Sequence, residues 1–141
     1  MEVGKSVKKI EQFEDIFEGK KILIVEDDDI GYSLLKEIFT DYEISIERAR
    51  DGLEAIEYFK HSKYAFDLVL MDLRLPNMNG FEATSRIKDI NPSIPVIAVS
   101  AYVHSQSIYD SQNSGCDAFI AKPFEIEHLI SIVQKYLTVN N

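Results

Sequence analysis

The sequence contains a single cysteine, Cys116, among 141 residues. One cysteine cannot form an internal disulfide or a multi-cysteine zinc site, and this usage fits a reducing cytosol. Lysine and arginine never occur in runs longer than two and are outnumbered by acids, 15 to 24, which argues against direct nucleic-acid binding. No apolar run is long enough for a membrane span or a signal-peptide core, so we expect a cytoplasmic protein without membrane insertion.

The chain is 45% apolar, which suffices for one hydrophobic core at this length. Residues 1–19 are highly charged, and their apolar residues recur at helical spacing. They form either a short amphipathic helix or a lead-in left from a longer protein, and we favour the lead-in. We expect one domain at residues 20–138, followed by a tail at 139–141.

Short apolar runs alternate with segments of helical periodicity in the rest of the chain. Predicted strands lie at 22–25, 44–48, 68–71, 95–99 and 117–121. Predicted helices follow each of them, at about 30–40 (with Asp29 as its N-cap), from Asp51-Gly52 onward, at 79–89, at 105–113 and at 126–137. This order predicts an α/β fold with a doubly wound, five-stranded parallel sheet, in which the less apolar run 44–48 is an edge strand.

Polar residues stand at the carboxyl ends of these strands: Glu26, Asp27, Asp72, Ser100 and Lys122. Because such ends meet at one edge of a parallel sheet, we expect these side chains to lie close together. Three adjacent carboxylates repel one another, and Mg²⁺ is the cation best suited to oxygen ligands. With Lys122 and Ser100 beside it, Asp72 is equipped to be phosphorylated, although Asp72 taken alone could be a turn carboxylate bonded to backbone. Asp28 and Asp29 fit a helix cap and a solvated acid better than ligands, and Gly80 fits a turn.

Four segments together carry a family resemblance. They are Ile-Leu-Ile-Val-Glu-Asp at 22–27, Leu-Met-Asp-Leu-Arg-Leu-Pro-Asn-Met-Asn-Gly at 70–80, Val-Ser-Ala at 99–101 and Gly-Cys-Asp-Ala-Phe-Ile-Ala-Lys-Pro-Phe at 115–124. In these segments the chain resembles the receiver (phosphoacceptor) domain of two-component response regulators, over roughly residues 20–137. The resemblance implies a flavodoxin-like fold with strand order 2-1-3-4-5.

The resemblance also implies a set of site residues. Asp72 would accept a phosphoryl group from a histidine kinase or a histidine phosphotransfer domain. Mg²⁺ would be bound by Asp27, Asp72 and the backbone carbonyl of Arg74, with Glu26 assisting through water. Lys122 would contact the phosphoryl group, and the Lys122–Pro123 peptide bond would be cis. The chain would then be a signalling module rather than an enzyme, catalysing only its own phosphotransfer and autodephosphorylation.

Signal output is expected to depend on Ser100 and Phe119. By the resemblance, Ser100 moves towards the phosphoryl group and Phe119 rotates into the vacated space. Phenylalanine stands where tyrosine is common, so a hydroxyl contact is unavailable, and Phe119 could also be a static core residue. Arg74 and Tyr102 are expected to tune the lifetime of the phosphoryl group.

Other functions leave different patterns. A haloacid dehalogenase-like phosphatase needs a second acid two residues after the nucleophile, where this chain has Arg74. A degenerate receiver that only docks partners would lack some of the site residues. A dinucleotide-binding module would need Gly-x-Gly-x-x-Gly after the first strand. The chain could be free-standing or part of a hybrid sensor kinase or a larger regulator, and its stimulus, kinase and output cannot be read from the sequence.

Overall fold

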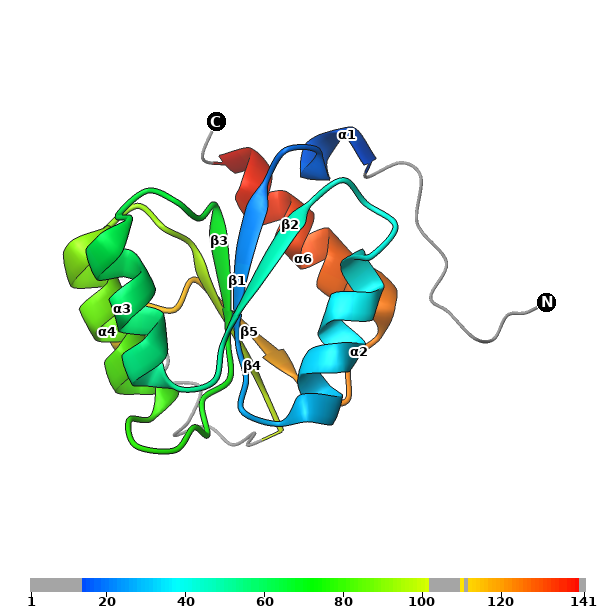
Figure 1. The fold of residues 1–141 in the computed structure, drawn as a ribbon. Helices are drawn as coiled ribbons and strands as arrows, with labels where there is room; N and C mark the ends of the chain where they lie inside the picture. Colours follow the sequence, from blue (N-terminus) through cyan, green and yellow to red (C-terminus); the bar gives the residue numbers. More distant parts are fainter. Residues whose placement is uncertain (1–13, 102–109, 111, 140–141) are drawn as a thin grey trace.

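The computed structural model describes residues 14–101, 110 and 112–139 (Figure 1). These residues contain one parallel sheet in the order β2-β1-β3-β4-β5. The strands are β1 (Lys21–Val25), β2 (Ser45–Ala49), β3 (Leu68–Met71), β4 (Val96–Ser100) and β5 (Ala118–Ala121). The predicted α/β fold, the strand order and the edge position of β2 are therefore confirmed.

Helices cover both faces of the sheet (Figure 1). One face carries α3 (Gly52–His61) and α4 (Gly80–Ile90), and the other carries α2 (Asp29–Phe39) and α6 (Ile126–Val139). The helix expected at 105–113 falls mostly outside the described residues. Within the described part of the chain, no helix is long and apolar enough to cross a membrane.

The alternation of side chains along the central strands builds two cores, one on each face. In β1, Ile22 and Ile24 pack towards α2 and α6, whereas Leu23 and Val25 pack towards α3 and α4. All four are almost completely buried. Burial on both faces explains why the central strands read as uninterrupted apolar runs.

Phe17 ends the short helix α1 (Glu14–Phe17) and is fully buried. Its ring packs edge-to-face on Phe39 and Tyr42, with centroid distances of 5.9 and 4.7 Å. The core therefore includes a residue that the expected domain boundary at residue 20 leaves in the lead-in. The helical spacing of apolar residues in this segment allowed an amphipathic helix, and residues 14–17 are helical, but the spacing did not single out Phe17 as the core residue.

Three helices begin at the carboxyl edge of the sheet, each with a polar N-cap. Asp28 caps α2, Asp51 caps α3 and Asn79 caps α4, and each side chain accepts a hydrogen bond from a backbone N–H three residues later. The sequence offered both Asp28 and Asp29 as the cap of α2: Asp28 is confirmed, and the alternative of Asp29 is wrong by one residue. The caps fix the helix starts beside the strand ends, where the candidate site lies.

Candidate functional site

Two acidic segments meet at the carboxyl edge of the sheet. Val25 and Met71, which end β1 and β3, are partners in the parallel ladder, so the residues that follow them start at the same level. The Asp72 backbone N–H donates to the Val25 carbonyl at 3.0 Å. Carboxylate oxygens of Glu26, Asp27 and Asp72 lie within 4.8 Å of one another. The structure thus brings together the three acids singled out in the sequence.

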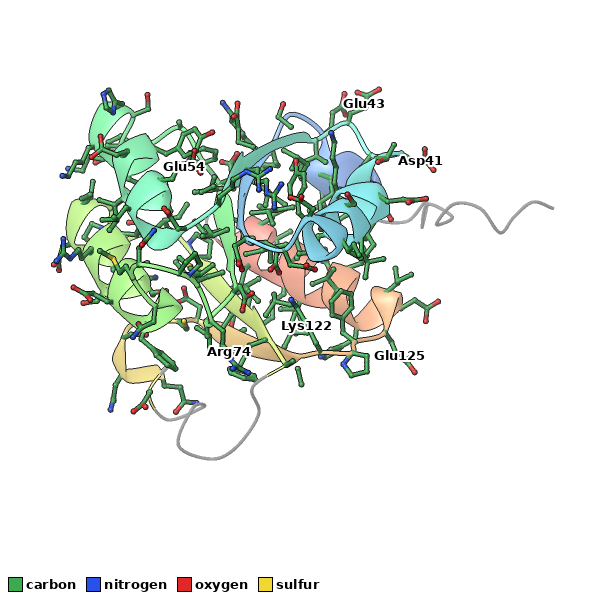
Figure 2. The ribbon with its side chains drawn as sticks, turned by 60° about the horizontal axis from the view of Figure 1, so that its bottom comes forward. Asp41, Glu43, Glu54, Arg74, Lys122 and Glu125 are labelled. Atoms are coloured by element: carbon green, nitrogen blue, oxygen red, sulfur yellow. The ribbon has the colours of Figure 1, made fainter. Side chains whose placement is uncertain are left out.

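Lys122 reaches the same edge from the end of β5. Its Nζ lies 2.8 Å from Oε1 of Glu26, whose side chain is only 3% exposed. The Lys122 backbone N–H donates to the Ser100 carbonyl at 2.9 Å, and the Lys122–Pro123 peptide bond is cis, as the resemblance implied. Figure 2 brings this edge forward, with Lys122 and Arg74 close to the strand ends. One of the three clustered acids is therefore neutralised by a lysine.

Asp72 is half-buried between these groups, and its Oδ1 accepts a hydrogen bond from the Arg74 backbone N–H at 3.0 Å. Burial is the main cause that raises the pKa of the Asp72 carboxyl to about 7. The Glu26 carboxylate also raises this pKa, whereas the Arg74 N–H and Lys122 lower it. A further cation at this edge would favour the ionised form of Asp72.

The donor set fits a magnesium ion. Three carboxylates face one another, and the one ammonium group described beside them, that of Lys122, is engaged by Glu26. A divalent cation would balance the remaining charge, and Mg²⁺ prefers such oxygen ligands while keeping several waters. The Arg74 carbonyl as a ligand and Glu26 acting through water stay predictions.

The other two acids of the run after β1 have different partners. Asp28 accepts a hydrogen bond from the Gly31 N–H at 2.7 Å, as expected of a cap. The Asp29 carboxylate lies 2.9 Å from Arg48 and 3.1 Å from Arg50, and these arginines lower its pKa, Arg48 most of all. Asp29 is therefore ion-paired rather than simply solvated, and neither acid belongs to the cluster.

The backbone after Asp72 depends on Gly80, which begins α4. Its N–H donates to the Leu73 carbonyl at 3.1 Å. A Cβ at this position would lie 2.7 Å from the Leu73 Cα and closer still to the Asp72 carbonyl oxygen. Gly80 is thus a site of close backbone approach rather than only a turn residue, which the sequence did not reveal.

The two predicted switch residues lie on neighbouring strands. Ser100 is fully buried at the end of β4. Phe119 lies in β5 opposite Ala98 of β4 and is partly buried against the core shared with α3 and α4. Their movement on phosphorylation stays a prediction. Tyr102 lies outside the described residues.

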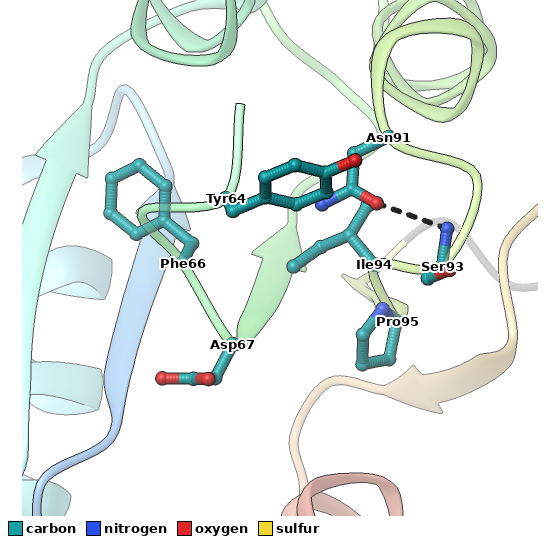
Figure 3. Close-up of a pocket in the computed structure, with 7 residues that line it drawn as sticks. All are labelled: Tyr64, Phe66, Asp67, Asn91, Ser93, Ile94 and Pro95. Carbon is teal, nitrogen blue, oxygen red and sulfur yellow. Dashed lines mark hydrogen bonds between the residues drawn. The ribbon is translucent and has the colours of Figure 1, made fainter. Parts of the chain in front are cut away.

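A pocket occurs at the opposite edge of the sheet (Figure 3). Its lining is mostly apolar or amide-bearing, and includes Tyr64, Phe66, Asp67, Asn91, Ser93, Ile94 and Pro95. Asp67, its one acid, accepts a hydrogen bond from the Lys21 backbone N–H at 2.8 Å. This pocket contains no acid cluster, so the carboxyl edge is the candidate site.

Comparisons with known proteins point to one family. Residues 22–134 match the model of the response regulator receiver domain. The chain is 35% identical to transcription factor SKN7 of Candida albicans over 116 residues, which cover 82% of this chain and 20% of that protein. It is 33% identical to the polar-differentiation response regulator DivK of Brucella anthropi over 120 residues, which cover 84% of this chain and 96% of DivK. The chain thus spans about a fifth of its SKN7 relatives and nearly all of DivK.

Solved structures give the same result. A CheY-like receiver domain protein from Methanospirillum hungatei is 31% identical with a TM-score of 0.76, covering 86% of this chain and 95% of that one. A two-component response regulator from Clostridium difficile is 29% identical with a TM-score of 0.80, covering 86% and 98%. The fold and the matches over most of the chain lead to one conclusion: this chain belongs to the response regulator receiver domain family.

Proposed function

We propose that this receiver domain is switched by transfer of a phosphoryl group from a phosphohistidine to Asp72, with Mg²⁺ as cofactor. The donor would be a histidine kinase or a histidine phosphotransfer domain. The observation that carries the proposal is the cluster of Glu26, Asp27 and Asp72 with Lys122 at one edge of the sheet. Burial that raises the pKa of Asp72 to about 7 supports an unusual role for this carboxyl.

Each residue has a distinct proposed part. An Asp72 oxygen forms the new bond to phosphorus while the phosphorus–nitrogen bond breaks and its electron pair returns to the imidazole. Asp27, Asp72 and the Arg74 carbonyl would hold the metal, with Glu26 assisting through water. Bound Mg²⁺ would offset charge on the phosphoryl oxygens. Lys122 and Ser100 supply a cation and a hydroxyl to the same oxygens.

The proposed output is a change in packing around Ser100 and Phe119, ended by autodephosphorylation. Ser100 would move towards the phosphoryl group and Phe119 would turn inward. Addition of beryllofluoride, a phosphoryl mimic, should change the NMR signals of the Phe119 ring. Unaltered signals would favour a static core role for Phe119.

We further propose that residues 20–138 act as the receiver unit in the cytoplasm, without binding nucleic acid directly, and that a separate protein or domain provides the output. A phosphatase of the haloacid dehalogenase kind is less well supported, because Arg74 stands where that family needs its second acid and its backbone N–H is used to hold Asp72. A degenerate receiver is less well supported because every predicted acid is present.

Incubation with Mg²⁺ and acetyl phosphate tests the assignment. The wild-type protein should gain one phosphoryl group, labile to hydroxylamine, by intact mass spectrometry. Asp72→Asn should gain none. Asp67→Asn, at the other end of the same strand, is the matched control and should be phosphorylated normally. Equal incorporation in Asp72→Asn, or none in the wild type, would overturn the proposal.

A further inference from the structure

Arg48 is a charged residue that is mostly enclosed although it lies on the edge strand. It pairs with Ile24 of β1 in the parallel ladder, so its side chain lies near the carboxyl end of that strand. Only 15% of its side chain is exposed. Its Nε and Nη2 donate to the Glu26 carbonyl at 3.1 and 3.0 Å, and its Nη1 lies 2.9 Å from the Asp29 carboxylate. All three guanidinium nitrogens therefore have acceptors on the acidic turn.

Two more contacts fix Arg48 itself. Its guanidinium lies over the Tyr32 ring, 4.5 Å from the centroid, and the Tyr58 hydroxyl donates to its backbone carbonyl at 3.1 Å. Both aromatic residues come from helices, Tyr32 from α2 and Tyr58 from α3. A planar guanidinium held in this way presents its donors in one geometry, which a flexible lysine cannot match.

The residue that Arg48 holds is Glu26, which is anchored at every polar group. Its N–H donates to the Ala49 carbonyl at 3.0 Å, its carbonyl accepts from Arg48, and its carboxylate accepts from Lys122 at 2.8 Å and from the Asp28 N–H at 3.2 Å. Asp27 is exposed, and its carboxylate has no hydrogen bond within the described part of the chain. The position of Asp27 is therefore set by the backbone on either side of it.

Arg48 also affects which of the four consecutive acids after β1 belong to the acid cluster. Together with Arg50 it engages Asp29, whereas Asp28 caps α2. Only Glu26 and Asp27 of the four consecutive acids then face Asp72. Loss of Arg48 would leave the Asp29 carboxylate with Arg50 but without its closer arginine, and would leave the Glu26 carbonyl without its side-chain donors.

We propose that Arg48 is a positioning residue for the metal site: by holding the Glu26 carbonyl and Asp29, it fixes the turn that presents Asp27 to the cation. This inference rests on the proposed function, because it assigns Arg48 a task at the same Mg²⁺ site. Arg48 does not touch the metal or the phosphoryl group. Groups that orient metal ligands typically change metal affinity by about 10- to 100-fold when they are removed.

Isothermal titration calorimetry with Mg²⁺ alone measures the effect directly. Arg48→Ala should bind Mg²⁺ about 10-fold more weakly than the wild type. Arg50→Ala is the matched control: Arg50 also pairs with Asp29 but is 61% exposed and does not reach the Glu26 carbonyl. Its Mg²⁺ affinity should stay within about twofold of the wild type, as expected for an exposed ion pair.

A second measurement separates positioning from general destabilisation. With acetyl phosphate, the Mg²⁺ concentration for half-maximal phosphorylation should rise about 10-fold in Arg48→Ala, whereas the rate at saturating Mg²⁺ should approach that of the wild type. If Arg48→Ala does not fold, Arg48→Lys is used for the same measurement. Lysine keeps the positive charge and the aliphatic chain but lacks the planar guanidinium with its several donors. Arg48→Lys should also need a higher Mg²⁺ concentration for half-maximal phosphorylation than the wild type, although the increase can be smaller than in Arg48→Ala.

The outcomes distinguish the two proposals. Wild-type binding of Mg²⁺ and phosphorylation of Asp72, with an unchanged Mg²⁺ requirement in the folded Arg48 variants, overturns the role of Arg48 alone. A reduced saturating rate without any change in Mg²⁺ affinity also overturns it. A wild-type protein that binds no Mg²⁺ and takes up no phosphoryl group overturns the proposed function, and the role of Arg48 with it.

Discussion

Asp67 and Asp72 stand at the two ends of the same buried strand, β3, but their carboxylates have different surroundings. Asp67 exchanges two hydrogen bonds with Lys21, its backbone N–H donating to the Lys21 carbonyl and its Oδ2 accepting from the Lys21 N–H, both at 2.8 Å. Asp72 accepts one backbone hydrogen bond, from Arg74, and lies beside two other acids, with the nearby Lys122 engaged by Glu26. The Asp67 carboxylate extends the hydrogen bonding of the sheet by one residue, whereas the Asp72 carboxylate lies close to other negative charges.

A second acid at the amino edge of the sheet has the same structural role as Asp67. Asp117, just before β5, accepts from the Val96 backbone N–H at 2.8 Å and from the Lys88 ammonium at 2.9 Å. At the amino edge, acids thus continue the hydrogen-bond ladder and are satisfied locally. At the carboxyl edge they converge without enough donors, which is costly unless a cation binds. The difference separates structural acids from candidate functional ones, although both kinds flank apolar strands in the sequence.

The largest effect is expected from Gly80→Ala, because the new methyl group would overlap the backbone of Asp72 and Leu73. Neither group can move without distorting the end of β3. We expect a loss of about 3 kcal/mol in the free energy of unfolding, measured by urea denaturation. Ser85→Ala, on the exposed side of the same helix, should change it by less than about 0.5 kcal/mol. Similar stability of the two variants would show that the close approach imposes no constraint.

Asp67→Ala tests the structural role of the amino edge. Removal of the carboxylate leaves the Lys21 N–H without its acceptor, and we expect a loss of about 2 kcal/mol in the free energy of unfolding. Asp67→Asn retains an acceptor oxygen and should lose clearly less. Phosphorylation of Asp72 should survive in both variants. A loss of phosphorylation with intact folding would mean that the two edges are not independent.

The fold was predictable because the three central strands are buried on both faces and so appear as continuous apolar runs. The positions of Glu26, Asp27 and Asp72 followed from one rule, that carboxyl ends of parallel strands share an edge. Their roles in phosphorylation and metal binding stay predictions. What the resemblance added beyond geometry was the strand order and the cis bond before Pro123, which are both present, and a phosphohistidine as the donor, which stays a prediction.

Other features could not be predicted because they depend on contacts between distant segments. Four consecutive acids offer several possible caps, and Arg48, some twenty residues later, engages Asp29 while Asp28 caps the helix. The approach of Gly80 to Asp72 depends on backbone geometry that no side-chain pattern records. The only feature of the sequence that marks Arg48 is its place at the end of a strand with alternating polar and apolar residues. Its contact with Glu26 depends on the register between β1 and β2, which the sequence pattern does not give.

The pH dependence of Mg²⁺ binding sharpens the contrast at the carboxyl edge. Burial raises the pKa of Asp72 to about 7, so below pH 7 a proton competes with the metal for this carboxylate. The affinity for Mg²⁺ should increase by about tenfold per pH unit up to pH 7 and level off above it, as measured by calorimetry. Asp72→Asn should bind weakly and lack this slope. Equal affinities at pH 6 and pH 8 in the wild type would contradict the raised pKa.

The smallest effect concerns stability without metal. The pKa of Asp72 in the folded protein, about 7, lies above its ordinary value of 3.8, so the folded state binds the proton more tightly than the unfolded state. The resulting stability is fully present below about pH 4 and is lost as the pH rises through 7. Asp72→Asn, which stays neutral, should therefore be more stable than the wild type at pH 8 in EDTA.

We expect a gain of only about 1 kcal/mol for Asp72→Asn at pH 8, because Asp72 is half-exposed and solvent reduces both the cost of burying its charge and the repulsion from Glu26. The two proteins should become equally stable only below about pH 4, where Asp72 is protonated in the unfolded state as well as in the folded state. Asp67→Asn should show no gain at pH 8, since its carboxylate is held by a donor rather than opposed by acids. A gain of the same size in Asp67→Asn, or one independent of pH, would mean that crowding of acids does not distinguish the two ends of β3. Mg²⁺ should reverse the order at pH 8, because it binds the folded wild type more tightly than the folded variant and therefore stabilises the wild type more.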